Sequence, residues 1–144
     1  MKEFPNILRA KRKAIEVNQG ELAKALGVSQ TSVNHWEVGG TVPTFFLVDA
    51  LADYLECSVD ELVGREGYKY APPKKMREFQ YILYGKMLEK GFKYESLSKQ
   101  IGLSQSALRS WTSGNTYPDL KCLCLLADAF KCSIDELMGR KLHS

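Results

Sequence analysis

The sequence has no apolar run near the roughly 18 residues needed to cross a bilayer, and its first residues are too charged for a secretory signal. It has only four cysteines, too few for a disulfide scaffold, and their neighbours are largely apolar, so we expect reduced thiols in a core. No segment alternates apolar and polar residues as a half-buried strand does. These absences predict an all-α, cytoplasmic protein without a membrane partner.

Patterns for catalysis and for cofactor binding are also missing. Neither a nucleophile elbow nor a Gly-rich phosphate loop occurs in the sequence. His35 has no partner at metal-ligand spacing, and Cys122 and Cys124 lie two positions apart on an expected helix, where side chains point away from each other. We therefore expect no enzyme activity, no cofactor and no metal site.

What the sequence does contain is an internal repeat. Displacing the chain by 75 positions aligns residues 2–65 with residues 77–140 without a gap, and 24 of the 64 aligned pairs are identical. Unrelated sequences match at roughly 6% of positions given ordinary residue usage. The chain is therefore two copies of one unit.

The repeat divides the chain into three parts. We expect a first domain at residues 1–65, a linker at 66–75 and a second, diverged domain at 76–144. Pro72 and Pro73 lie in the linker and favour an extended segment there.

Each copy has the pattern of five short helices. In the first copy the second helix opens with a capping box from Asn18 to Glu21, and the third begins after Ser29, a good N-cap residue. The fourth helix follows Pro43, and the fifth opens with a second capping box at Ser58.

The stretch from Gln19 to Glu37 is the most informative part of the first copy. Gly27 lies where a tight turn needs a positive φ, which is cheap only for glycine. Small or apolar residues fill the angle between the flanking helices: Leu22, Ala23, Leu26, Val33 and Trp36. This pattern predicts two helices joined by a tight turn, the motif whose second helix enters a DNA major groove.

The sequence resembles the phage-repressor/Cro class of helix-turn-helix domain, also called the Xre type. The matching residues are Gln19, Leu22-Ala23, Leu26-Gly27-Val28-Ser29, Val33, Trp36-Glu37, Gly39, Pro43, Leu51-Ala52, Leu55, Ser58 and Glu61-Leu62. The resemblance covers both copies and implies two tandem five-helix, lambda-repressor-like domains. It also implies sequence-specific binding of double-stranded DNA, usually by a dimer on a two-fold operator.

The resemblance assigns roles in the first copy. Gln19 matches a glutamine that binds a DNA phosphate, and Arg12 and Glu37 match a buried ion pair between the first and third helices. The base-reading positions are Gln30, Thr31, Asn34 and His35. Glutamine can bond adenine bidentately, and a threonine methyl can contact thymine. Lys11 and Lys13 are further phosphate candidates, although a run of this kind is usually a solvated face.

The second copy departs from the family pattern at three of these positions. The replacements are Tyr94 for Gln19, Met87 for Arg12 and Thr112 for Glu37. Joint loss of a buried ion pair is compatible with the fold, whereas loss of one partner costs about 3–5 kcal/mol. DNA contact by this copy stays open, with Gln105, Ser106, Arg109 and Ser110 as its candidate residues. Its half is the more basic: residues 67–144 sum to +6 and residues 1–66 to −3.

The leading hypothesis is a bacterial or phage-derived transcriptional regulator, and we expect a repressor that occludes a promoter. Two geometries stay open, a homodimer of two chains and an intramolecular pseudo-dimer of the two copies. The competing class is a protein-interaction or antitoxin-like module that kept the fold and lost the reading face. An apolar excess on the fourth helix of the second copy, at Leu120, Cys124 and Leu125, suggests a face that packs either on the first copy or on another chain.

Overall fold

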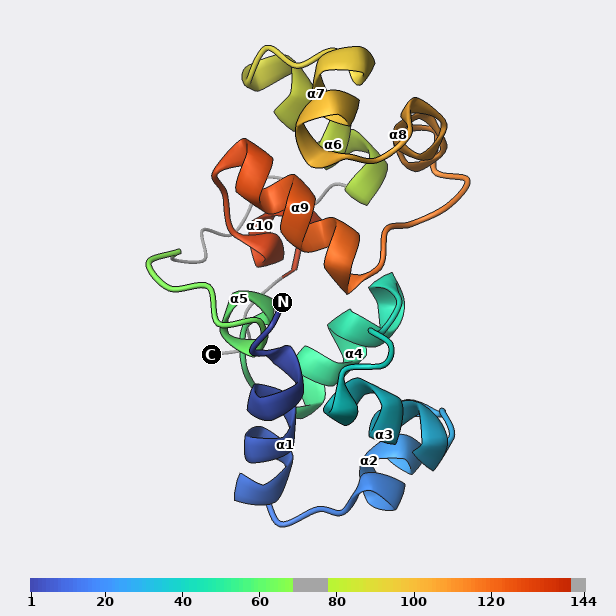
Figure 1. Cartoon of the computed structure of the whole chain (residues 1–144), viewed down its shortest axis with the longest axis vertical. Coiled ribbons are helices and arrows are strands. Elements are labelled where there is room, and N and C mark those ends of the chain that lie inside the picture. Colours follow the sequence, from blue (N-terminus) through green and yellow to red (C-terminus); the bar gives the residue numbers. More distant parts are fainter. Residues whose placement is uncertain (69–77, 141–144) are drawn as a thin grey trace. The chain divides into compact units, whose positions relative to one another are not determined.

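The computed structural model describes residues 1–68 and 78–140, and the contacts within the chain divide it into two compact units with their boundary after residue 67. Each unit contains five helices, and the described residues contain no strand (Figure 1). The prediction of an all-α chain with two tandem five-helix domains is confirmed. Most of the predicted linker, residues 69–75, lies outside the described residues.

The first unit begins close to the N-terminus of the chain. Its helices are α1 (Phe4–Ala14), α2 (Gln19–Leu26), α3 (Gln30–Val38), α4 (Phe45–Tyr54) and α5 (Val59–Leu62). Asn18 and Glu21 form the expected capping box at the start of α2. The Ser29 side chain accepts from the Ser32 backbone N–H at the start of α3, and the Ser58 side chain caps α5 in the same way. Local sequence signals therefore fix where these helices begin.

The second unit repeats this order. Its helices are α6 (Phe79–Glu89), α7 (Tyr94–Ile101), α8 (Gln105–Thr112), α9 (Leu120–Phe130) and α10 (Ile134–Met138). The turn between α7 and α8 is made by Gly102, whose φ of 73° matches the 71° of Gly27 in the first unit. The second copy therefore keeps the backbone of the helix-turn-helix.

Each unit has its own apolar core. Fully buried side chains in the first unit include Phe4, Leu8, Leu22, Val33, Val48, Leu51 and Leu62. Those in the second unit include Leu83, Leu97, Leu108, Leu120, Leu123, Leu126, Phe130 and Leu137. Trp36 and Trp111, at equivalent positions, are also buried. Burial of this apolar surface is the main term that holds each small unit together.

An ion pair between the first and last helix recurs in both units. Lys11 Nζ lies 2.7 Å from Glu61 Oε1, and Lys86 Nζ lies 2.9 Å from Glu136 Oε1. Burial alone would lower the pKa of Lys86, but the hydrogen bond and the charge of Glu136 outweigh it and raise this pKa. The pair joins α5 to α1 and α10 to α6 in the same way.

The four cysteines are present as thiols, two of them buried and two half-buried. Burial and the neighbouring Asp119 raise the pKa of Cys122 to about 11. Among the described residues, no group of three His, Cys, Asp or Glu side chains could hold a metal ion. Within the same residues, every helix is too short or too polar to span a membrane.

Candidate nucleic-acid interface

A helix-turn-helix occupies the first unit, where α2 and α3 pack against each other across the turn at Gly27 (Figure 1). The Gly27 N–H donates to carbonyl oxygens of the last turn of α2, and its positive φ redirects the chain into α3. A Cβ at this position would meet no atom within 4 Å, so the backbone conformation alone favours glycine. Leu22, Val33 and Trp36 fill the angle beneath the turn.

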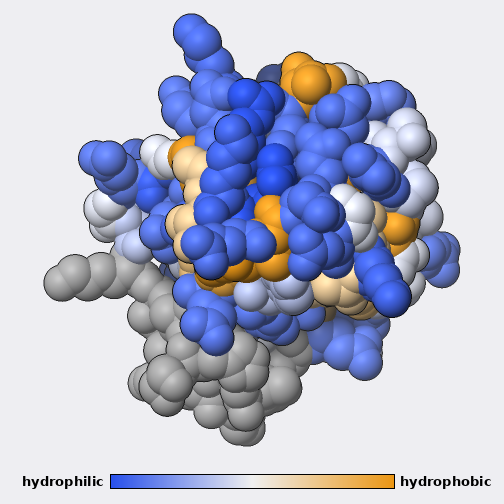
Figure 2. Space-filling model, turned by 90° about the horizontal axis from the view of Figure 1, so that it is seen from below, coloured by the Kyte–Doolittle hydropathy of each residue, from blue (hydrophilic) through white to orange (hydrophobic). Residues whose placement is uncertain are grey.

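The first turns of α3 carry the residues expected to read bases. Gln30, Thr31, Asn34 and His35 are all exposed, and their spacing of i, i+1, i+4 and i+5 places them on one side of the helix. The structure therefore brings the four side chains together, with their amide, hydroxyl and imidazole groups directed away from the core. The end of the first unit on which the connection before α2 lies is mostly hydrophilic, with a few apolar patches (Figure 2).

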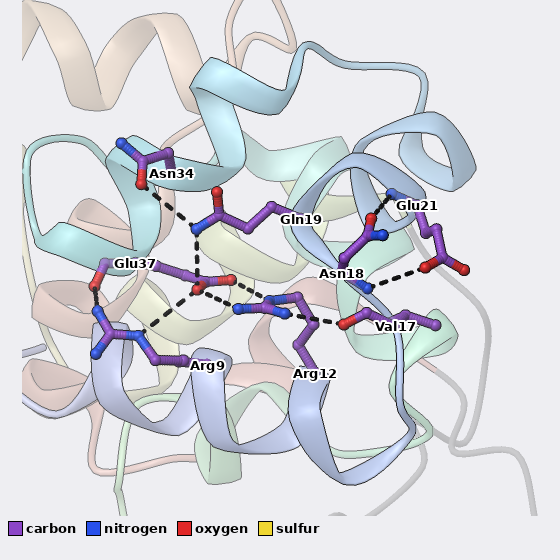
Figure 3. A network of polar contacts seen from close by, with 8 residues as sticks. All are labelled: Arg9, Arg12, Val17, Asn18, Gln19, Glu21, Asn34 and Glu37. Atoms are coloured by element: carbon purple, nitrogen blue, oxygen red, sulfur yellow. Dashed lines mark hydrogen bonds and ion pairs between the residues drawn. The ribbon is translucent and has the colours of Figure 1, made fainter.

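Directly beneath this face, Glu37 is the centre of a polar network between three helices (Figure 3). Its carboxylate accepts from Arg12 Nε at 2.6 Å and from Arg12 Nη2 at 2.9 Å, a bidentate pair that ties α1 to α3. Arg12 Nη1 also donates to the Val17 carbonyl at 2.9 Å, ahead of α2. Glu37 is 1% exposed, so this charge is compensated almost entirely by protein groups.

The protonation states of this network follow from its geometry. Burial alone would raise the pKa of Glu37, but hydrogen bonds from Arg12 and Gln19 and the nearby positive charges outweigh it and lower this pKa. The hydrogen bond to Glu37 raises the pKa of Arg12 against the opposing effect of burial. Both groups therefore stay ionised near neutral pH.

Gln19 links the buried pair to the exposed face. Its Nε2 donates to Glu37 Oε1 at 3.2 Å and to Asn34 Oδ1 at 3.4 Å (Figure 3). Both amide N–H groups of Gln19 therefore donate to protein acceptors, so neither is available to donate to a phosphate oxygen. A phosphate contact by Gln19 requires the longer bond, to Asn34, to open. Gln19 therefore connects Asn34, one of the residues expected to read bases, to the ion pair beneath it.

Arg9 belongs to this network, although sequence reasoning did not single it out. Its Nη2 donates to the Glu37 carbonyl at 2.9 Å, and its Nε lies 3.7 Å from Glu37 Oε1. The side chain is 42% exposed, so part of the guanidinium faces solvent beside α3. The available signal was the i, i+3 spacing of Arg9 and Arg12, which places both on one face of α1.

The two lysines of the same helix differ in their surroundings. Lys11 is turned toward α5, where it pairs with Glu61, and does not join the network around Glu37. Lys13 is exposed on the last turn of α1. Of the two lysines, only Lys13 presents a charge that no ion pair of the described residues holds.

The second unit rebuilds the same junction without a buried charge pair. Tyr94 Oη lies 2.9 Å from Thr112 Oγ1, which repeats the contact between Gln19 and Glu37. The Arg109 guanidinium lies 4.4 Å from the centre of the Tyr94 ring, which repeats the contact between Asn34 and Gln19. Met87 is 2% exposed in the place of Arg12. The joint replacement explains why the fold survives the loss of the ion pair.

The four candidate DNA-contact residues of the second unit differ in their exposure to solvent. Gln105, Ser106 and Arg109 are exposed, and Ser110 is half-buried with its hydroxyl 2.6 Å from Thr116 Oγ1. The stacked Arg109 leaves this face with an aromatic and cationic character that α3 lacks.

Comparison with known proteins places both units in one family. The helix-turn-helix family model matches residues 8–62 and again residues 84–137, so the chain belongs to this helix-turn-helix family. No solved structure matches the chain significantly.

Three characterised relatives are similar to part of the chain. The cryptic phage CTXphi transcriptional repressor RstR of Vibrio cholerae is 43% identical over 58 residues, 40% of this chain and 52% of that protein. The HTH-type transcriptional regulator DicA of Escherichia coli is 39% identical over 67 residues, 46% of this chain and 50% of that protein. Repressor protein C2 of Salmonella phage P22 is 38% identical over 56 residues, 39% of this chain and 26% of that protein.

These relatives confirm the resemblance to the phage-repressor class. Each similarity spans at most about half of the relative's length, as the shares of 52%, 50% and 26% indicate. Each aligned segment, of 58, 67 or 56 residues, is about as long as one helix-turn-helix unit.

Proposed function

We propose that this chain is a DNA-binding transcriptional regulator that acts as a repressor, with α3 of the first unit in the major groove. The observation that carries the proposal is the exposed polar face of α3, held from beneath by the buried pair of Arg12 and Glu37. A rigid support matters because base readout depends on placing each donor and acceptor to within a fraction of an ångström. The names of the three relatives, all regulators or repressors, support the same function.

The proposed division of labour follows from side-chain chemistry. The amides of Gln30 and Asn34 contact adenine edges, and the Thr31 methyl and the His35 ring complete the base contacts. Gln19 and Lys13 hold the phosphate backbone and fix the register of the helix. Repression then occurs in the cytoplasm through occupation of a promoter and needs no catalytic step.

A two-fold operator requires two recognition helices about 34 Å apart. A homodimer supplies two copies of α3, whereas an intramolecular pseudo-dimer supplies α3 and α8. The competing function, a protein-interaction module, is favoured for the second unit alone, because Tyr94 replaces the phosphate-binding glutamine and stacks with Arg109.

Selection of bound sequences from a random duplex pool tests the proposal. We expect enrichment of one motif, and we expect Gln30→Ala with His35→Ala to abolish that enrichment while the helical circular dichroism spectrum is unchanged. The matched control is Gln105→Ala with Ser110→Ala, which changes the equivalent positions of α8. Failure of the wild-type chain to enrich any motif contradicts DNA reading. Loss of enrichment only in the control pair assigns reading to the second unit.

A further inference from the structure

The outward face of α6 carries a stripe of exposed apolar side chains. Tyr81, Tyr84 and Leu88 are 57%, 48% and 64% exposed, and they recur at i, i+3 and i+7 with Gly85 between them. The core residues Phe79, Leu83 and Met87 lie on the opposite side of the helix. Single exposed apolar residues are ordinary on protein surfaces, but a continuous stripe along one helix marks an interaction site. This set of four residues, 81, 84, 85 and 88, is called the α6 stripe below.

The first unit provides an internal comparison, because it has the same fold and the same helix. The residues of α1 equivalent to the apolar members of the α6 stripe are Asn6, Arg9 and Lys13. All three are polar, so the fold of a unit does not require an apolar surface here. The apolar character of the stripe therefore needs an explanation other than the stability of the unit.

Gly85 supplies a second, independent observation. It lies in the interior of α6, where glycine is less favourable than alanine, and the equivalent residue of α1 is Ala10. A Cβ at Gly85 would meet no atom within 4 Å, so nothing in its own unit demands glycine. A glycine on an exposed helix face allows the backbone of another helix to approach closely.

The surface beside the stripe is hollowed and has the composition of a protein interface. Two adjoining depressions share Tyr84, Tyr94 and Arg109 in their lining, and Tyr81 and Leu88 border one depression each. Tyrosine and arginine are enriched at protein interfaces and dominate their binding energy. The exposed stripe and these depressions form one continuous surface.

The charges at the two ends of α6 indicate which partner fits. Exposed Glu78 precedes the helix, and exposed Lys90 and Lys93 follow it. Glu89, the last residue of α6, is also exposed, but its carboxylate lies 3.8 Å from Lys86 Nζ of the same helix. A second α6 in antiparallel orientation places each glutamate near the lysines of the other copy. The two helix dipoles then also oppose each other favourably. This end-to-end complementarity favours self-association over an unrelated partner.

We propose that the α6 stripe is a self-association surface, on which α6 of a second copy packs antiparallel about a two-fold axis close to Gly85. The apolar face expected on α9 does not compete as an exposed surface, because Leu120 and Cys124 are buried and Leu125 is half-buried. The contact selects the homodimer from the two geometries considered above. It does not depend on DNA binding.

Sedimentation of the full chain with the Leu88→Glu variant tests the surface. We expect a dimer for the wild-type chain at about 100 µM and at least about a tenfold weaker association for the variant. Ile15→Glu is the matched control, since Ile15 is 45% exposed at the end of α1 and the substitution adds the same charge. A wild-type chain that stays monomeric, or equal weakening by both substitutions, overturns the proposal.

A crosslinking experiment tests the position of the axis without weakening the surface. Packed helices have axes about 8–10 Å apart, which leaves facing Cα atoms on a two-fold axis within disulfide reach. Gly85→Cys should therefore give a disulfide-linked dimer under mild oxidation. Ala10→Cys, at the equivalent position of α1, should crosslink no more than the wild-type chain with its native thiols. Equal crosslinking of the two variants, or none by Gly85→Cys, contradicts the proposed axis.

Discussion

Replacing the charged pair of the first unit by the residues of the second unit tests how the junction is stabilised. Arg12→Met alone leaves the buried Glu37 carboxylate without its bidentate partner, and Glu37→Thr alone leaves the Arg12 guanidinium, whose side chain is 10% exposed, unpaired. Each single substitution should destabilise the first unit by about 3–5 kcal/mol. A unit of this size has a total stability of only about 3–10 kcal/mol, so either variant should be close to unfolding.

The double variant removes both charges and should lose far less than the sum of the two single losses. We expect a loss of about 1–2 kcal/mol, because Thr112 in the second unit has Tyr94 as its partner whereas Gln19 cannot pack in that way. Adding Gln19→Tyr should recover about 1 kcal/mol through the hydroxyl contact seen in the second unit.

Urea unfolding followed by tryptophan fluorescence gives the required free energies. Each unit has one tryptophan, so a Trp111→Phe background makes the signal specific for the first unit. The energies of the two single variants and the double variant form a double-mutant cycle, and we expect a coupling energy of at least about 3 kcal/mol. Additive losses would refute the account of Glu37 as a compensated buried charge.

Three further outcomes are expected. Because the pKa of Glu37 is lowered in the folded state, its contribution to stability is present above the ordinary carboxylate pKa and is lost as the pH falls below it. As the pH falls through the acidic range, the free energy of unfolding of the first unit should therefore decrease more steeply in wild type than in the double variant, and urea unfolding at a series of pH values will test this. Gly27→Ala should cost about 1–2 kcal/mol through its positive φ alone, since no atom blocks a Cβ, and a melting curve of the Trp111→Phe chain measures this. With a pKa of about 11, the thiol of Cys122 should react with a thiol reagent much more slowly at pH 8 than an ordinary cysteine; rapid modification of that residue, located by mass spectrometry, would contradict its burial.

Much of the fold follows from the sequence because its signals are local. The capping residues Asn18, Ser29 and Ser58 and the turn residue Gly27 act within a few positions of themselves, and the structure has helix ends where they place them. The repeat then gives the second unit at once, since Gly102 has the same backbone conformation as Gly27.

The details of the site depend on the direction of side chains around α1, which local signals do not specify. Lys11 and Arg12 are adjacent in the sequence, yet Lys11 turns toward α5 and Arg12 toward α3. Arg9 lies one turn before Arg12 and joins the same carboxylate, a contact visible only once α3 is placed.

The second unit shows another structural feature that its sequence does not predict. Its sequence shows that the family residues are gone, but not that Tyr94 meets both Thr112 and Arg109 to rebuild the junction. An apolar excess on α9 is likewise evident from the sequence. Only the packed structure distinguishes that largely buried helix from α6, whose apolar residues Tyr84 and Leu88 remain exposed.

The most direct test of the proposed function couples one side chain to one base pair. The affinity of the wild-type chain and of Gln30→Ala should be measured on the selected operator and on operators with single base-pair changes. We expect Gln30→Ala to lose about 1–3 kcal/mol of discrimination at one base pair and to keep it at the others. A uniform loss of affinity at every position, or unchanged discrimination throughout, would contradict base reading by α3.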